Sequence, residues 1–374
     1  MRILILASIP KSLSNFRGAL IETLVASGHD VHVGAPSIYG DRATCAWLTA
    51  RGVSYHEVPL SRTNLNVVDD LRSLLALYRL MRKIGPDLVL AYTIKPVIWG
   101  MIAAKLRRVP KRVALITGLG YAFVGEARGK RAMIRLLASK LYKIALRCAS
   151  LVFFQNPDDR DDFRKWAILP ADLKVLLVNG SGVDTATFAV APMPHRPPLR
   201  FLLIARLLWD KGIREYVQAA RVTREAHPEA EFHLVGPIDT NPEAISETEV
   251  RSWEDAGILI WHGAQSDVRS LIGAAHVYVL PSYREGTPRS VLEAMSMGRP
   301  IITSHAPGCR ETVIDGVNGF LVPVREAEPL ALAMQRFIRE PHLVKQFGDA
   351  SRRIAEEKYD VHKVNAVIIE ALDL

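Results

Sequence analysis

Short runs of apolar, β-branched and aromatic residues alternate with helix-length segments along the whole chain. Such runs, bounded by turn residues, are typical of buried strands. Because a helical pattern follows most of them, we expect right-handed crossovers between parallel strands. The pattern predicts thirteen strands, over residues 2–8, 30–36, 54–59, 87–93, 112–117, 151–155, 174–178, 200–205, 231–235, 258–262, 276–281, 300–304 and 319–322.

Thirteen strands exceed the usual size of a single open sheet, so the chain is predicted to be an α/β protein with two parallel sheets. The boundary is placed at AVAPMPHRPPL, a proline-rich segment that cannot form a regular element. The predicted organisation is an N-terminal domain over residues 1–188, a linker over 189–199 and a C-terminal domain over 200–355. A last helix over 356–374 could pack back onto the first domain.

The composition is that of a folded globular protein. Of the 374 residues, 49% are hydrophobic and 23% are charged, which excludes a disordered chain. No apolar run is long enough for a membrane span, and the start resembles a first strand more than a signal peptide. Cys45, Cys148 and Cys309 are far apart and form no Cys-x-x-Cys pair. This cysteine usage predicts a reducing compartment, and therefore the cytoplasm.

The net charge of +9 is unevenly distributed. Basic residues are in excess in the first half, where Glu126 is the only acid between Asp87 and Asp158. Such a field attracts anionic lipid, nucleic acid or phosphorylated substrates. A basic nucleic-acid-binding protein is the alternative of another class. It is disfavoured because no binding motif or aromatic platform is recognisable, and nucleic acid is not an expected partner.

The segment PSYREGTPRSVLEAMSMG carries the most informative side chains. Glu285 lies in a turn after a predicted strand, and Glu293 lies about one turn into the following helix. Both can face the crevice at the carboxyl ends of the strands, where open α/β sheets bind ligands. Two carboxylates suit the hydroxyls of a sugar and a ribose, because each oxygen accepts charge-assisted hydrogen bonds. By spacing alone, an equally good interpretation is that Glu285 is an ordinary turn residue and Glu293 an acid on the helix surface, with no ligand between them.

Glu-x7-Glu in this setting resembles the signature of the retaining family 4 glycosyltransferases. IARLLWDKGIREYVQAA, LVGP, WHGAQSDV and DGVNGFLVP occur in that family's order. NFRGALIETLVASGHDVHV, YTIKP, TGLGYAF, FFQNPDDRDDF and NGSGVD resemble a subgroup that assembles O-antigen, capsule and lipid-linked oligosaccharides, with N-acetylgalactosaminyl- and galacturonosyltransferases among its members. The resemblance implies the GT-B fold, two Rossmann-like parallel-sheet domains that face each other across a cleft.

The resemblance also implies roles for residues of the second domain. Arg206 and Lys211 would neutralise the donor diphosphate as its charge develops, and Glu285 would hold hydroxyls of the donor sugar. The remaining donor-binding residues implied are Glu293 at the ribose, the backbone of Gly286 and Thr287, and Gly236, His262 and Gly263 beside the nucleotide.

The first domain is expected to supply the acceptor side. Asn15 and Arg17 are predicted to open the first helix, where free N–H groups favour an anion. Arg17 could bind a lipid diphosphate or a substrate carboxylate, and a solvated arginine in a first helical turn is an equally good interpretation. Lys95 and the loop containing Gly118 and Gly120 would line the same side, by resemblance. Many family members have a histidine in that loop, and this chain does not.

The activity implied is transfer of a hexose-type sugar, with N-acetylhexosamine or uronic acid favoured, from a UDP-sugar to an undecaprenyl-diphosphate-linked saccharide. A same-fold alternative uses GDP-mannose or a soluble acceptor. No cofactor or metal is expected. Asp159-Arg160-Asp161 resembles a metal-binding Asp-x-Asp, but Asn156 as an N-cap and Pro157 at the first helical position explain those acids better.

The segment 128–147 is predicted to be a two-faced helix. Its expected inner stripe is Met133, Ile134, Leu137, Leu141 and Ile144, with Arg128, Arg131, Arg135, Lys143 and Arg147 projecting outward. The outward bases form either a solvated face or one that lies on anionic lipid. The second interpretation predicts a peripheral protein at the inner face of the plasma membrane.

Overall fold

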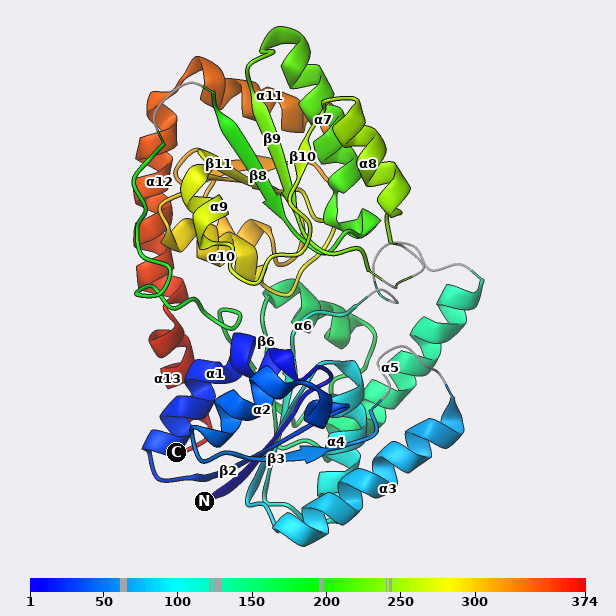
Figure 1. Cartoon of the computed structure of the whole chain (residues 1–374). Coiled ribbons are helices and arrows are strands. Elements are labelled where there is room, and N and C mark those ends of the chain that lie inside the picture. Colours follow the sequence, from blue (N-terminus) through cyan, green and yellow to red (C-terminus); the bar gives the residue numbers. More distant parts are fainter. Residues whose placement is uncertain (61–65, 121–122, 124–128, 195–197, 240, 242–243) are drawn as a thin grey trace. The chain divides into compact units, whose positions relative to one another are not determined.

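The structure is a computed structural model that describes residues 1–60, 66–120, 123, 129–194, 198–239, 241 and 244–374 (Figure 1). The chain forms two compact units. The first comprises Met1–Ser181 together with Asn365–Leu374, and the second comprises Gly182–Val364.

The first unit is built on a seven-stranded parallel sheet with the order β3-β2-β1-β4-β5-β6-β7. Its strands are β1 (Arg2–Leu6), β2 (Asp30–Ala35), β3 (Ser54–Glu57), β4 (Leu88–Tyr92), β5 (Lys111–Ile116), β6 (Leu151–Phe154) and β7 (Lys174–Leu177). Its helices are α1 (Lys11–Ala26), α2 (Arg42–Thr49), α3 (Val67–Ile84), α4 (Ile94–Leu106), α5 (Lys130–Cys148) and α6 (Pro157–Lys165). Buried side chains of α3, α4 and α5 share one apolar core with one face of the sheet.

The second unit is built on a six-stranded parallel sheet with the order β10-β9-β8-β11-β12-β13. Its strands are β8 (Arg200–Ile204), β9 (Glu231–Val235), β10 (Ile260–Trp261), β11 (Val277–Leu280), β12 (Ile301–Ser304) and β13 (Gly319–Val322). Its helices are α7 (Ile213–Ala226), α8 (Glu247–Asp255), α9 (Arg269–Ala274), α10 (Arg289–Ser296), α11 (Ala327–Arg339) and α12 (His342–Ile354).

All thirteen predicted strands are present, with ends that differ by a residue or two, and the prediction of two parallel sheets is confirmed. The last helical segment is interrupted. A π-helical turn over Ala355–Tyr359 separates α12 from α13 (Val361–Ala371). Ile368 and Leu372 of the last segment are buried, and Lys111 of β5 donates a hydrogen bond to the carbonyl of Leu372. Residues 365–374 thereby complete the first unit, although they follow the whole second unit in the sequence.

The proline-rich segment belongs to the second unit. Ala191 and Met193 pack against its core. The fully buried guanidinium of Arg299 donates to the carbonyls of Ala191 and Pro192, at 3.2 and 3.0 Å, and also to those of Ile272 and Gly273. One side chain therefore ties this irregular segment to the end of α9.

Helix α5 presents a different face to solvent from the one predicted. Of the expected inner stripe, Ile134 and Leu141 do pack against the core, but Met133, Leu137 and Ile144 are exposed, and Tyr142, Ala145 and Leu146 are buried instead. Arg135, expected to project outward, lies over the indole ring of Trp166 at 4.4 Å. The expected bases Arg128 and Arg131 lie outside the residues whose side chains the structure describes. Among the helices of the described ranges, none combines the length and apolar content that crossing a membrane requires.

Candidate functional site

A lysine and a glutamate meet at the carboxyl edge of the second sheet. Strands β8 and β11 are hydrogen-bonded neighbours, so the loops that follow them emerge at the same edge. The first loop ends in a 3₁₀ turn that contains Lys211, and the second contains Glu285. Lys211 Nζ lies 2.6 Å from Glu285 Oε1, which also accepts a 2.6 Å hydrogen bond from Ser282 Oγ. Only 14% of the lysine side chain and 17% of the glutamate side chain are exposed.

This shielding strengthens the electrostatics of the pair. Burial opposes the charged lysine, but the carboxylates of Glu285 and Asp210 outweigh it, so the pKa of Lys211 is raised. The lysine therefore remains a cation at neutral pH. A fixed ammonium group in a site with little water can neutralise a leaving phosphate without reorganisation.

Glycines allow the loops after β8, β11 and β12 to approach one another closely, with Gly212 in the first of these loops and Gly308 in the last. Gly212 has φ +72°, and a Cβ there would lie 2.1 Å from the carbonyl oxygen of Pro281. Gly308 has φ +80°, and a Cβ there would lie 2.2 Å from the carbonyl oxygen of Glu285. The amide of Tyr283 donates to the carbonyl of Asp210 at 2.9 Å. The Lys211–Glu285 distance is therefore set by backbone contacts on both sides.

Glu293 lies on α10, as expected, and it is shielded from solvent. Its Oε1 accepts a 2.8 Å hydrogen bond from Arg289 Nε, one helical turn earlier. Burial raises its pKa, and Arg289 offsets only part of this effect. Gly286 and Thr287 lie in the turn between Glu285 and Pro288, which precedes α10. The structure thus brings both carboxylates of the motif and the turn between them to the end of β11.

The raised pKa of Glu293 gives a testable dependence on pH. In the folded state this carboxyl holds its proton more tightly than in the unfolded chain. Its ionisation therefore costs stability as the pH rises through the folded-state pKa. We expect Glu293→Gln to increase the melting temperature relative to the parent at pH 7 more than at about pH 4, the ordinary range of a glutamate. Losing a charged hydrogen-bond acceptor should lower kcat/KM for the sugar donor roughly tenfold to a hundredfold.

The matched control for this prediction is Glu247→Gln. Glu247 also pairs with an arginine one turn away on its helix, Arg251, but that pair is exposed. This variant should leave both the pH profile of the melting temperature and kcat/KM unchanged. A Glu293→Gln protein with the parent's kcat/KM would remove Glu293 from the donor site.

Arg206, Gly236 and Gly263 lie along the ends of β8, β9 and β10. Arg206 Nη1 is 2.6 Å from a carboxylate oxygen of Asp239, and its side chain is partly exposed. Gly236 has φ +152°, and a Cβ there would lie 1.7 Å from the carbonyl oxygen of Ala205. Its amide donates to the carbonyl of Gly263 at 2.9 Å. The structure therefore places these three residues on the same edge as Lys211, with Asp239 as a partner that sequence reasoning missed.

His262 ends a chain of side chains that sequence reasoning also missed. Arg200 Nε lies 2.7 Å from Glu231 Oε2, which lies 3.3 Å from His233 Nε2. His233 Nδ1 is 2.9 Å from His262 Nε2, and the two rings stack. Burial lowers the pKa of both histidines. With His233 donating to Glu231, His262 donates to His233 and keeps Nδ1 as an acceptor.

The first unit contains the same chain of side chains at the same place in its sheet. Arg2 pairs with Asp30 at 3.0 Å, Asp30 with His32 at 3.2 Å, and His32 with His56 at 3.0 Å. In both units an acid stands two residues before the first histidine of the pair, on the strand beside the arginine. The repeated spacing of an acid two residues before a histidine on a strand was the signal by which these chains could have been found in the sequence.

The acceptor-side residues need one correction. Helix α1 begins at Lys11 and not at Asn15, because Pro10 already has helical φ and ψ. Asn15 is therefore exposed within the helix, and Arg17 lies in its second turn. Arg17 is buried, with its guanidinium 5.3 Å from the ring of Tyr92. An anion at this place would be held by the side chain of Arg17 and not by the free N–H groups of a helix start.

The other acceptor-side residues gather near the ends of β4 and β5. Lys95, in the first turn of α4, forms a shielded 2.8 Å ion pair with Asp70 of α3. Gly118 and Gly120 follow β5 with φ +124° and +72°. Because Tyr92 is the last residue of β4, Arg17, Lys95 and these glycines share the carboxyl edge of the first sheet.

The acids after β6 belong to the start of a capped helix. Asn156 Oδ1 accepts a 2.8 Å hydrogen bond from the amide of Asp159, and Pro157 is the first residue of α6, which confirms the predicted cap. Asp161 pairs with Arg160 and Arg164. Within the described ranges, no three His, Cys, Asp or Glu side chains gather where they could hold a metal ion.

The fold has two units with parallel sheets, and a cation and carboxylates lie at the carboxyl edge of the second sheet. These features are those of a GT-B glycosyltransferase. Residues 192–354 match the family described as glycosyl transferases group 1, and residues 15–180 match the glycosyl transferase 4-like domain. The chain therefore belongs to the family 4 glycosyltransferases, as the sequence predicted.

Named relatives agree with this assignment. The chain is 27% identical over 355 residues to the N,N'-diacetylbacillosaminyl-diphospho-undecaprenol alpha-1,3-N-acetylgalactosaminyltransferase of Campylobacter jejuni, a match that covers 92% of this chain and 91% of the relative. It is 28% identical over 297 residues to the UDP-Gal:alpha-D-GlcNAc-diphosphoundecaprenol alpha-1,3-galactosyltransferase of Escherichia coli, covering 75% and 73%. HepE of Anabaena, solved with UDP, has the same fold at a TM-score of 0.75 and 20% identity, with all of both chains covered.

Proposed function

We propose that this glycosyltransferase is a retaining, metal-independent hexosyltransferase. Its donor would be a UDP-sugar, with N-acetylhexosamine or uronic acid favoured, and its acceptor an undecaprenyl-diphosphate-linked saccharide. The transfer would take place at the inner face of the plasma membrane, in the assembly of a cell-surface polysaccharide such as O-antigen or capsule. The observation that carries the proposal is the shielded Lys211–Glu285 pair at the carboxyl edge of the second sheet.

The donor site follows from the charges at that edge. Lys211 and Arg206 are both held by carboxylates, from Glu285 and Asp239. A bound diphosphate would take over these cations, which releases Glu285 to accept hydrogen bonds from sugar hydroxyls. When the bond from the anomeric carbon to the phosphate oxygen breaks, negative charge grows on that oxygen. The two cations stabilise this charge more than they stabilise the ground state.

The nucleotide and the acceptor are assigned by complementary chemistry. A neutral His262 with Nδ1 as an acceptor suits an imide N–H such as that of uracil, which supports a UDP donor. Buried Arg17 and shielded Lys95 suit an acceptor that carries phosphate. Two relatives act, by their names, on saccharides linked to diphospho-undecaprenol, and this supports the same class of acceptor here.

The decisive experiment is a transfer assay with a synthetic polyprenyl-diphosphate sugar and a panel of UDP- and GDP-sugars. We expect a UDP-N-acetylhexosamine or a UDP-uronic acid to support the highest rate. The product's anomeric configuration, read by nuclear magnetic resonance, should match that of the donor. An inverted product would contradict the retaining mechanism, and transfer from GDP-mannose alone would contradict the donor class.

The same assay tests whether transfer is independent of a metal ion. Two cations at the diphosphate do the work that a divalent ion does in other enzymes. After the protein is stripped of metal, the rate in excess chelator should equal the rate in added magnesium or manganese. A rate that falls to background in chelator and returns with either ion would refute metal independence.

A further inference from the structure

Among the side chains that the structure describes, the outward face of α5 is apolar in the first half of the helix. Met133, Leu136, Leu137 and Ile144 expose 67%, 58%, 45% and 49% of their surface. At 100° per residue these four positions fall on one side of the helix, together with exposed Lys140 and Arg147. Three large apolar side chains therefore stand in the first half of this face, and both bases stand in the second half.

Helix α3 repeats this arrangement. Val67, Val68, Leu71 and Leu75 are exposed in its first half. The exposed residues of its second half include Arg79, Arg82 and Lys83. In both helices the exposed large apolar side chains thus stand mainly in the first half, and, apart from Arg72 of α3, the exposed bases that the structure describes stand in the second half.

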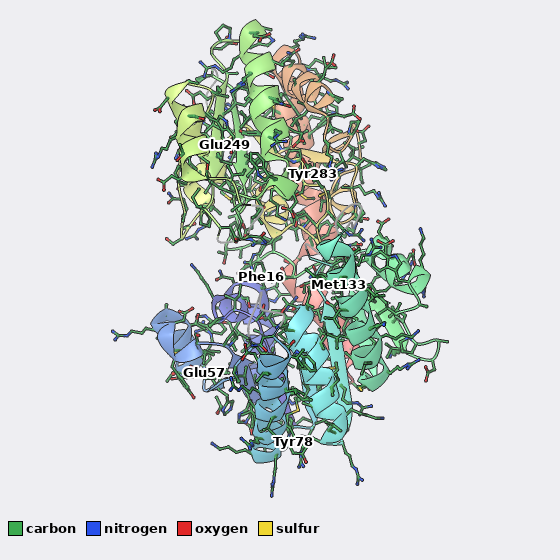
Figure 2. All side chains as sticks on the ribbon, turned by 90° about the vertical axis from the view of Figure 1, so that its right-hand side faces the viewer. Phe16, Glu57, Tyr78, Met133, Glu249 and Tyr283 are labelled. Carbon is green, nitrogen blue, oxygen red and sulfur yellow. The ribbon has the colours of Figure 1, made fainter. Side chains whose placement is uncertain are left out.

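The topology brings the two apolar halves to the same edge. Helices that connect parallel strands on one face of a sheet run in the same direction, opposite to the strands. Helix α4 packs between α3 and α5, and Figure 2 shows this layer facing the viewer, with Tyr78 on α3 and Met133 on α5 labelled. The helix starts therefore lie toward the carboxyl edge of the first sheet, the edge that contains Arg17 and Lys95.

From this geometry we infer that the outer faces of α3 and α5 form one membrane-docking surface. Their apolar first halves enter the outer acyl region of an anionic bilayer, and the bases of their second halves bind lipid phosphates. Large apolar side chains that gather on one exposed face often mark an interaction surface, and the neighbouring bases give this face the charge of a lipid-binding surface. A second copy of the chain is less suited, because like charges would meet around the apolar contact.

This inference rests on the proposed lipid-linked acceptor and deepens it. A polyprenyl diphosphate has its phosphates at the headgroup level of the bilayer. Docking through the carboxyl edge would bring the buried Arg17 and its neighbours close to that level. The apolar contact also distinguishes this surface from the purely basic face expected from the sequence, because salt screens charges but does not abolish apolar burial.

The test is flotation of the full chain with two kinds of vesicle. One kind contains equal parts of phosphatidylglycerol and phosphatidylcholine, and the other phosphatidylcholine alone. The parent should float with the anionic vesicles, and a measurable part of this binding should survive salt of about 0.5 M, where the Debye length falls below about 5 Å. The variant Met133→Gln/Leu136→Gln/Leu137→Gln keeps every base, and should bind the anionic vesicles at least about tenfold more weakly. Leu71→Gln/Leu75→Gln should give a loss in the same direction.

The matched control is Val222→Gln/Ile314→Gln/Leu332→Gln, which removes three comparably exposed apolar side chains from the second unit. It should bind as the parent does, and all variants should keep the parent's melting temperature and activity on a short soluble acceptor. Parent-like flotation of the α5 variant would overturn the inference. A parent that elutes as a dimer and never floats, while the α5 variant is monomeric, would assign the face to self-association. Vesicle binding without any glycosyl transfer would instead refute the proposed function alone.

Discussion

Replacing Lys211 with alanine should lower kcat by roughly a hundredfold to a thousandfold, the range found when one fixed stabiliser of developing charge is removed. Lys211 is a shielded cation, and alanine leaves the diphosphate with Arg206 alone. The substitution also leaves the Glu285 carboxylate without its cation, so the free enzyme should repel the donor phosphates. Initial rates over a range of donor concentrations separate the two effects, because the first lowers kcat and the second raises KM.

Two companion variants make this prediction specific. Lys211→Arg keeps the charge and should recover part of kcat, with losses due to the altered shape of the cation. Lys345→Ala is the matched control, because Lys345 forms an ion pair of the same 2.6 Å length with Asp349 on an exposed helix surface. It should change neither kcat nor KM. If Lys211→Ala turns over at the parent's rate, the lysine has no part in catalysis and the assignment of this edge fails.

The second large effect is expected at Gly212. A Cβ at this residue would lie 2.1 Å from the carbonyl oxygen of Pro281, and backbone atoms cannot rotate away as a side chain can. Gly212→Ala should therefore push the loop with Lys211 away from the loop with Glu285. We expect a stability loss of about 2–4 kcal/mol, from a positive-φ alanine and a displaced backbone together. Turnover should fall by at least about a hundredfold, because a shift of about 1 Å is enough to misplace the lysine.

Gly257 provides the control for backbone strain. It has φ +64°, close to that of Gly212, but nothing lies within 4 Å of its hypothetical Cβ. Gly257→Ala should lose only about 1–2 kcal/mol and keep full activity. Chemical denaturation and initial rates on the same preparations measure both quantities. Equal losses at the two glycines would show that φ strain, and not the approach to Pro281, makes Gly212 necessary.

The strands could be predicted because each is a short apolar run between turns, and parallel pairing follows from the helices between them. Glu285 and Lys211 could be named from the two separate motifs that contain them. Their ion pair could not, since its length depends on how β8 and β11 are paired and on the close approach at Gly212. The two histidine chains were missed for the same reason, because each joins side chains that three neighbouring strands bring together, with His262 directly after the last of them.

The error at α5 has a different cause. Its sequence contains two apolar stripes, one through Met133, Leu137 and Ile144 and one through Tyr142, Ala145 and Leu146. Periodicity cannot decide which of the two faces the sheet. The aromatic group of Phe123, Phe163 and Trp166 decides it, because Tyr142 packs edge-on against Phe163 and Arg135 covers Trp166. The start of α1 was misplaced because Asn15 is a good capping residue, whereas Pro10 begins the helix without a side-chain cap.

The division of the chain has a consequence for the order of folding during synthesis. The second unit is one continuous stretch, whereas the first needs Asn365–Leu374 to cover its remaining apolar surface. Domains usually fold in the order in which the ribosome releases them. Here the unit that begins first is completed last, after Ile368 and Leu372 have left the ribosome. A chain truncated after Val364 would therefore have a complete second unit and an open first one, whose uncovered apolar surface is exposed to proteases and chaperones.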